Sequence, residues 1–177
     1  MCDGIDVPVR RFFRRKYDAV RTLEQFALTA RDEVDLDRLA AELVGRFEIV
    51  RKGLAATALT ANTSVLTAVS NDFGYDGAFA RQIEALGRPG DLAFAISKSG
   101  ESPNVVTGVK AARESGLPVV ALTGTDGGEL AGLVDLCICV PSRSAARIQE
   151  AHRLIIHTLC ALVEDSLQNI EFPPDSI

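Results

Sequence analysis

The sequence lacks the features that mark membrane proteins, secreted proteins and nucleotide-binding proteins. No apolar run reaches the roughly 20 residues that span a bilayer, and no apolar core follows the basic segment Arg10–Lys16 as in a signal peptide. A P-loop lysine and a dinucleotide fingerprint are both absent. The four cysteines have no metal-binding or redox spacing, which favours reduced, buried cysteines in a cytoplasmic protein. We therefore expect no membrane association and no nucleotide cofactor.

The charge and the length narrow the possibilities further. The formal net charge of −5 argues against a nucleic-acid partner, and the 177 residues suffice for one domain with a full core. The chain contains no internal repeat and no low-complexity segment. We divide it into an N-terminal extension at 1–16, a single domain at 17–170 and a flexible tail at 171–177, where two prolines favour fraying.

Helical and strand patterns alternate along most of the chain. The first half predicts helices at Tyr17–Thr29, Leu36–Phe47, Asn62–Val69 and Ala78–Leu86, with a strand at Gly53–Leu59 and a turn at Asn71–Asp76. The second half predicts strands at Asp91–Ile96, Pro118–Leu122 and Leu136–Val140, followed by helices at Pro103–Ser115, Glu129–Leu133 and Ala145–Leu167. Because the strands are apolar throughout, they predict an α/β three-layer sandwich with a central parallel sheet.

Three serines cluster where the first of these later strands ends. Ser97, Ser99 and Ser102 surround Gly100, with Ser102 at the N-cap position and Pro103 at the first position of the next helix. Hydroxyls and backbone N–H groups that converge at a helix N-terminus, on the carboxyl edge of a sheet, favour a bound phosphate. An ordinary strand-to-helix turn is the alternative, but the density of serine favours a small phosphorylated ligand.

Five segments occur in an order that is typical of one family. They are Leu43-Val-Gly-Arg-Phe47, Ser70-Asn-Asp-Phe-Gly-Tyr75, Ser97-Lys-Ser-Gly-Glu-Ser102, Leu122-Thr-Gly-Thr-Asp-Gly-Gly128 and Arg147-Ile-Gln-Glu-Ala-His152. From about Leu39 to about Leu167, the chain resembles the sugar isomerase (SIS) domain and, within it, the phosphoheptose isomerases. The resemblance implies a Rossmann-like or flavodoxin-like fold that assembles into a homo-oligomer, typically a tetramer, with sites shared between subunits.

The resemblance also implies a reaction and its residues. Phosphoheptose isomerases convert sedoheptulose 7-phosphate into D-glycero-D-manno-heptose 7-phosphate through an enediolate, which requires acid–base groups. Glu42 matches the catalytic glutamate of the family, and His157 matches its catalytic histidine. Further positions match the substrate site: Asn71 and Asp72 line the sugar, Ser97, Lys98, Ser99 and Ser102 form the phosphate loop, and Gln149 completes the set.

A divalent metal, often zinc, is bound by some members of the family. Glu42, Gln149 and His157 match three of the four metal ligands. Arg38 stands where those members have histidine, and arginine stays protonated and cannot act as a ligand. We therefore expect zinc occupancy to be weak or absent.

The residues alone leave other interpretations open. Glu42 on an amphipathic helix is ordinarily a solvated charge, His157 lies in an apolar run where core histidines are common, and Gln149 fits an exposed helix position. The register of His152 does not match the family, so we treat it as structural. We interpret Asp126–Gly128 as a turn that requires glycine.

One departure from the family bears on function. The family places a strand and a Gly-Asn-Gly-Gly-Ser loop before the helix that carries the glutamate, and the interval Thr29–Asp35 shows no such pattern. We expect residues to be missing between Thr29 and Arg38, since a sheet without its central strand would leave backbone groups unpaired. A true deletion would favour the alternative function, a non-catalytic SIS module that binds a sugar phosphate or a protein partner of the replication-initiator-associating type.

Overall fold

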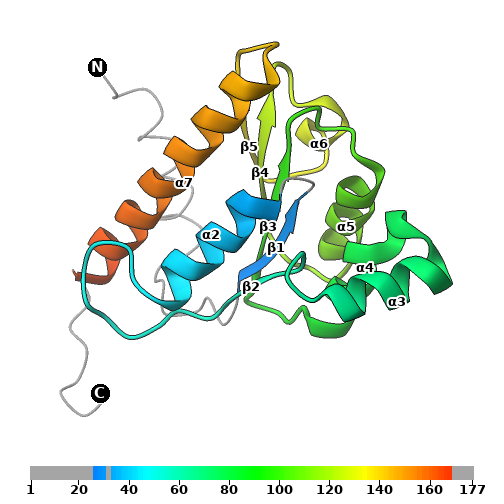
Figure 1. The fold of residues 1–177 in the computed structure, drawn as a ribbon, viewed down its shortest axis with the longest axis horizontal. Helices are drawn as coiled ribbons and strands as arrows, with labels where there is room; N and C mark the ends of the chain where they lie inside the picture. Colours follow the sequence, from blue (N-terminus) through cyan, green and yellow to red (C-terminus); the bar gives the residue numbers. More distant parts are fainter. Residues whose placement is uncertain (1–25, 31–32, 169–177) are drawn as a thin grey trace.

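Five parallel strands form one sheet in the centre of the molecule (Figure 1). The computed structural model describes residues 26–30 and 33–168; the predicted extension 1–16 and tail 171–177 lie outside this part. The strand order is β2-β1-β3-β4-β5. Their bounds are β1 Phe26–Ala30, β2 Ala56–Ala58, β3 Leu92–Ser97, β4 Val119–Gly124 and β5 Leu136–Val140.

Helices cover both faces of this sheet, so the predicted three-layer α/β sandwich is confirmed (Figure 1). α2 and α7 pack on one face, and α4 and α5 pack on the other. The helical elements are α2 Glu33–Val44, α3 Thr63–Phe73, the 3-10 helix η2 Tyr75–Gly77, α4 Ala78–Leu86, α5 Pro103–Glu114, α6 Gly128–Ala131 and α7 Ala145–Gln168. No helix in the described part of the chain is long and apolar enough to cross a membrane.

Alternate residues of each central strand belong to different cores. In β3, Phe94 and Ile96 pack against α2 and α7, whereas Ala93 and Ala95 pack against α4 and α5. This alternation follows from the period of two in a strand. Both faces are covered, so β3 and β4 are buried along their whole length, as apolar strands of a parallel sheet require.

The sheet order changes direction at β1. β2 pairs with one side of β1 and β3 pairs with the other, both in parallel. In open α/β sheets, ligands bind outside the carboxyl ends of the strands at such a switch point. The loop after β3, which contains the three serines, begins at this place.

The strand that was predicted to be missing is present. The predicted helix at Tyr17–Thr29 is wrong over its last four residues, which belong to β1, and its earlier part lies outside the described residues. A short apolar segment such as Phe26–Ala30 does not distinguish a buried strand from a helix by periodicity alone. Only residues 31–32, outside the described part, separate β1 from α2. The strand argument for missing residues before Arg38 therefore fails, whereas the lack of a Gly-Asn-Gly-Gly-Ser loop in the sequence remains a departure from the family.

Two smaller expectations also need correction. α3 continues to Phe73, so the predicted turn at Asn71–Asp76 begins only at Gly74, which has a φ of 79°. The cysteines were expected to be buried, and Cys160 is, but Cys139 on β5 is exposed. In the described sheet β5 is an edge strand, with a neighbour on one side only, and this position leaves its side chains more accessible.

Candidate active site

The serine loop, residues 97–102, joins the end of β3 to the start of α5. Ser97 and Ser102 are buried, and their Oγ atoms lie 3.1 Å apart. Ser102 occupies the N-cap position as predicted, but its hydroxyl makes no capping hydrogen bond. The side chains of Lys98 and Ser99 are exposed. Two hydroxyls thus meet at a helix N-terminus, and a third accompanies a lysine at the surface, an arrangement that suits an anion.

Glycines bring the serine loop into direct contact with the next loop along the sheet edge. Gly100 has a φ of 68°, and a Cβ on it would lie 1.8 Å from the carbonyl oxygen of Gly127. The N–H of Gly124 donates to the carbonyl of Lys98 at 2.9 Å, and that of Leu130 donates to Gly100 at 3.1 Å. Positive φ values at Gly127 and Gly128 confirm the predicted turn there. Only glycine at position 100 allows the two backbones to approach so closely.

α2 and α7 run side by side in the same direction (Figure 1). We call the contact between them the seam; it extends from Asp35 to Glu42 on α2 and from Arg153 to Glu164 on α7. Asp35 of α2 contacts Arg153 of α7 at 3.4 Å, across 118 residues of sequence. Glu42 and Cys160 have the same separation in sequence, and Glu42 is close enough to the Cys160 thiol to act on it electrostatically. Burial raises the pKa of that thiol to about 12, and the carboxylate of Glu42 adds to the rise.

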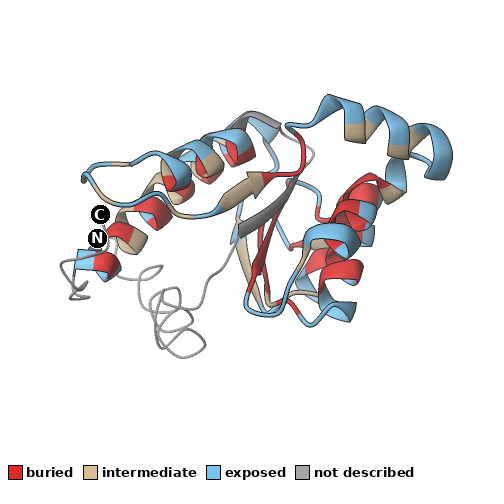
Figure 2. Cartoon of the chain, turned by 90° about the horizontal axis from the view of Figure 1, so that it is seen from below, coloured by how far each residue is buried: buried red, intermediate tan, exposed pale blue. Residues whose placement is uncertain are grey.

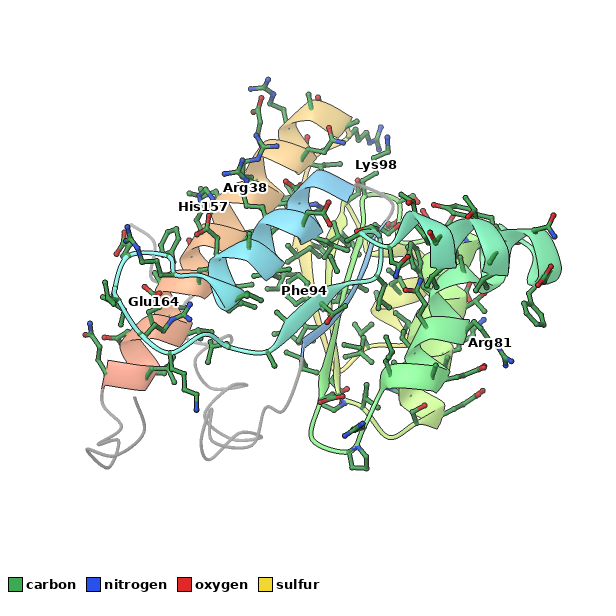
Figure 3. The ribbon with its side chains drawn as sticks, turned by 60° about the horizontal axis from the view of Figure 1, so that its bottom comes forward. Arg38, Arg81, Phe94, Lys98, His157 and Glu164 are labelled. Carbon is green, nitrogen blue, oxygen red and sulfur yellow. The ribbon has the colours of Figure 1, made fainter. Side chains whose placement is uncertain are left out.

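This register places the proposed acid–base residues along one seam. His157 is level with the turn of α2 between Arg38 and Glu42, and Figure 3 shows Arg38 and His157 on neighbouring helices. Glu42 and His157 are half-buried, and Arg38 is exposed. In the described part of the chain, the side chains of Arg38 and Glu42 have no hydrogen-bond or ion-pair partner. Among the described residues, the seam therefore combines a carboxylate and a guanidinium without side-chain partners and an imidazole.

A buried carboxylate that the sequence analysis missed lies further along the seam. Glu164 of α7 accepts hydrogen bonds from the N–H groups of Phe47, Glu48 and Ile49 at 2.8–3.0 Å, and from Nε of Arg51 at 3.0 Å. Burial alone would raise the pKa of Glu164, but these four donors outweigh it and hold the pKa below its ordinary value. A signal was available, because Glu164 is a lone charge on the apolar stripe of α7.

Arg51 connects this carboxylate to the end of α2. Its Nη1 donates to the carbonyl of Leu43 at 2.9 Å, and its Nη2 donates to the carbonyl of Glu42 at 2.8 Å. These carbonyls are in the last turn of α2, where backbone acceptors have no partner within the helix. Beside the same loop, the ring of Phe47 lies 5.5 Å from that of His157.

Other predicted residues lie apart from the seam within one chain. Asn71 and Asp72 are exposed near the end of α3, a helix without buried residues that packs on η2 and α4 (Figure 2). Gln149 follows Ile148, whose side chain approaches Gly124 next to the serine loop. His157 lies about two turns further along α7 than Gln149. The serine loop, the predicted sugar-lining pair and the acid–base pair thus belong to different elements of the chain.

His152 has the environment of a structural residue. It is fully buried, and its Nε2 lies 2.9 Å from the carbonyl oxygen of Thr123 at the end of β4. The contact ties α7 to the sheet close to the serine loop. It gives His152 no access to a ligand in the single chain.

Comparisons with known proteins identify the family of the chain. The model of the family described as SIS domain matches residues 32–124, slightly more than half of the chain. A protein of Roseiflexus sp. (strain RS-1) named phosphoheptose isomerase is 53% identical over 133 residues, which are 75% of this chain and 68% of that protein.

Two solved structures extend the similarity to the fold. The phosphoheptose isomerase of Neisseria gonorrhoeae matches with a TM-score of 0.76 at 42% identity, over 82% of this chain and 78% of that one. The phosphoheptose isomerase of Francisella tularensis matches with a TM-score of 0.85 at 30% identity, over 92% and 88%. The chain belongs to the SIS-domain family and, within it, to the phosphoheptose isomerases.

Proposed function

We propose that this protein is an aldose–ketose isomerase that converts sedoheptulose 7-phosphate into D-glycero-D-manno-heptose 7-phosphate. The observation that carries the proposal is the identity of about one half with phosphoheptose isomerases, 53% over 133 residues of this chain for one of them. Its free thiols at Cys137, Cys139 and Cys160 are compatible with a cytoplasmic enzyme.

The reaction transfers a proton between neighbouring carbons. A base removes a proton from C1 of the ketose while an acid protonates the oxygen on C2, which gives an enediol or enediolate. A proton then returns to C2, and the oxygen on C1 loses its proton to form the aldehyde. Glu42 and His157 are the groups that we assign to these transfers, because an unpaired carboxylate and an imidazole are suited to them.

The remaining residues are assigned to binding. The phosphate lies at Ser97, Ser99 and Ser102, with Lys98 and the N-terminus of α5 balancing its charge. Asn71, Asp72 and Gln149 contact the sugar. We propose that the site is completed between copies of the chain in a homotetramer, as the family resemblance implies.

The predicted set of metal ligands does not fit a resident zinc ion. The Arg38 guanidinium stays protonated and repels a cation, and only Glu42, Gln149 and His157 remain as donors. In the described part of the chain, no three His, Cys, Asp or Glu side chains gather into a metal-binding group. We propose that Arg38 supplies the positive charge that stabilises the enediolate oxygen.

The proposal that no zinc ion is resident can be tested by substitutions at Arg38. Protein purified without added metal should carry less than one zinc per chain by elemental analysis, and chelators should leave its activity unchanged. Arg38→His restores a donor and should raise zinc binding, whereas Arg38→Lys, which keeps the charge without a donor, should not. Stoichiometric zinc in the unmodified protein would contradict the proposal.

The acid–base assignment is tested by incubation with sedoheptulose 7-phosphate and detection of the aldose. Glu42→Gln and His157→Ala should each lower kcat by roughly 10²- to 10⁴-fold, the usual contribution of a general acid or base. Glu84→Gln, at an exposed ion pair on α4, is the matched control and should keep full activity. A wild-type protein that is inactive with and without zinc would favour the non-catalytic SIS module instead.

A further inference from the structure

We propose that Glu164 and Arg51 form a clamp that positions both proposed acid–base residues, Glu42 and His157. The proposal rests on the proposed isomerase activity, and it concerns residues that the reaction itself does not use. The two side chains belong to elements far apart in sequence and are almost entirely buried, with exposed fractions of 8% for Arg51 and 4% for Glu164. Each uses its hydrogen-bonding capacity on backbone groups around the seam.

One arm of the clamp leads to His157. The carboxylate of Glu164 accepts from three consecutive backbone N–H groups, those of Phe47, Glu48 and Ile49. This fixes the backbone at Phe47, whose ring lies 5.5 Å from the imidazole of His157 at an interplanar angle of 32°. His157 and Glu164 are seven residues apart on α7, so they lie on nearly the same side of the helix. The carboxylate therefore places an aromatic wall beside the imidazole.

The other arm leads to Glu42. The guanidinium of Arg51 donates to the carbonyls of Glu42 and Leu43 while its Nε donates to Glu164. It thus fixes the backbone of the residue that carries the proposed base, in a turn where α2 would otherwise fray. The planar fork of arginine reaches these acceptors together, which the single ammonium of lysine cannot do.

The charged character of Glu164 and Arg51 indicates that the pair positions its neighbours and contributes little net stability. A buried ion pair contributes little net stability relative to an apolar replacement of the same volume, because both charges lose their hydration. Apolar side chains would fill this space next to the core cluster of α2 and α7, but they would not bind six backbone groups in fixed directions. What the pair supplies is a defined position for the backbone at Glu42 and at Phe47.

The first test observes His157 without any turnover. The chain has two histidines, so selective isotope labelling gives two imidazole signals, with buried His152 as the internal reference. Glu164→Gln, Arg51→Lys and Phe47→Leu should each move the His157 signal and leave that of His152 in place. Phe73→Leu and Glu84→Gln, at an exposed ring and an exposed ion pair, are the matched controls.

The second test measures kinetics with sedoheptulose 7-phosphate. Glu164→Gln and Arg51→Lys should lower kcat by roughly tenfold to a hundredfold with little change in KM, since displacement of a reacting group by about 1 Å can cost about a hundredfold. Phe47→Leu should lower kcat by roughly threefold to tenfold. The double variant Glu164→Gln with Phe47→Leu should be little worse than Glu164→Gln alone if both act through the same ring.

The outcomes separate the clamp from the proposed function. An inactive wild-type protein overturns the isomerase assignment, and the His157 signal then decides the clamp alone. A wild-type kcat together with an unmoved His157 signal in folded Glu164→Gln would overturn the clamp. Should Glu164→Gln fail to fold, Phe47→Leu and Arg51→Lys decide the matter in the same way. A loss confined to KM would also contradict positioning of the acid–base groups.

Discussion

The serine loop and the seam are built in different ways. The serine loop depends on short stretches of backbone, since residues 97–102 contact residues 124–130 through hydrogen bonds and glycine packing. The seam depends on side chains more than 100 residues apart, such as Glu164 with Arg51 and Arg153 with Asp35. The first is a close backbone junction at the carboxyl edge of the sheet, and the second is a contact between two helices that a few polar groups align.

The comparison predicts different kinds of sensitivity. A substitution in the serine loop should act through the backbone. No residue larger than glycine should be tolerated where the two loops touch. A change in the seam should act through charge and hydrogen bonding, and its effect should depend on pH. Two substitutions, each with a matched control, examine these expectations.

The larger effect is expected for Gly100→Ala. Its Cβ would collide with the carbonyl of Gly127, and its φ of 68° is unfavourable for any residue with a side chain. Left-handed strain and overpacking together should lower the free energy of unfolding by about 4 kcal/mol, measured by urea denaturation. Gly116→Ala is the control, because its φ of 74° is similar but no atom lies within 4 Å of the added Cβ.

The control should lose only about 1 kcal/mol, the cost of the backbone conformation alone. The difference between the two variants then measures how tightly the serine loop packs against its neighbour. Equal losses in Gly100→Ala and Gly116→Ala would show that the two loops separate easily. The serine loop would then be no more rigid than a surface turn.

The sequence predicted the parts of the fold that local patterns determine. Ala78–Leu86 and Leu136–Val140 have the predicted bounds, and the serine loop lies where the strand-to-helix junction placed it. β1 was missed because a short, mainly apolar segment next to charged residues fits either a helix or a strand. Its central place in the sheet follows only from pairing with β2 and β3, which no local window contains.

The candidate site divides in the same manner. The serine loop followed from residue types at a junction, whereas Glu42 and His157 were recognised only through the family resemblance. Arg51 and Glu164 were not found, since a pair 113 residues apart leaves no local pattern. The charge on the apolar stripe of α7 indicated a buried carboxylate but did not identify its partner.

The smaller effect, and the one that depends on pH, is expected for Glu164→Gln. The folded pKa of Glu164 lies below its ordinary value, so its carboxylate stabilises the fold fully at pH values above the unfolded pKa of about 4.3. At pH 7 the substitution should lower the free energy of unfolding by about 3 kcal/mol, because Arg51 and the three N–H groups lose a charged acceptor.

This loss should shrink as the pH falls below about 4.3 and further through the folded pKa, since the wild-type carboxyl also becomes neutral there. Urea denaturation of both proteins at several pH values between about 3 and 7 measures this difference in the free energy of unfolding. Glu84→Gln, whose exposed partner is Arg81, should change stability by less than about 1 kcal/mol at any of these pH values. A Glu164→Gln loss that stays constant with pH would mean that shape, and not charge, aligns the two helices of the seam.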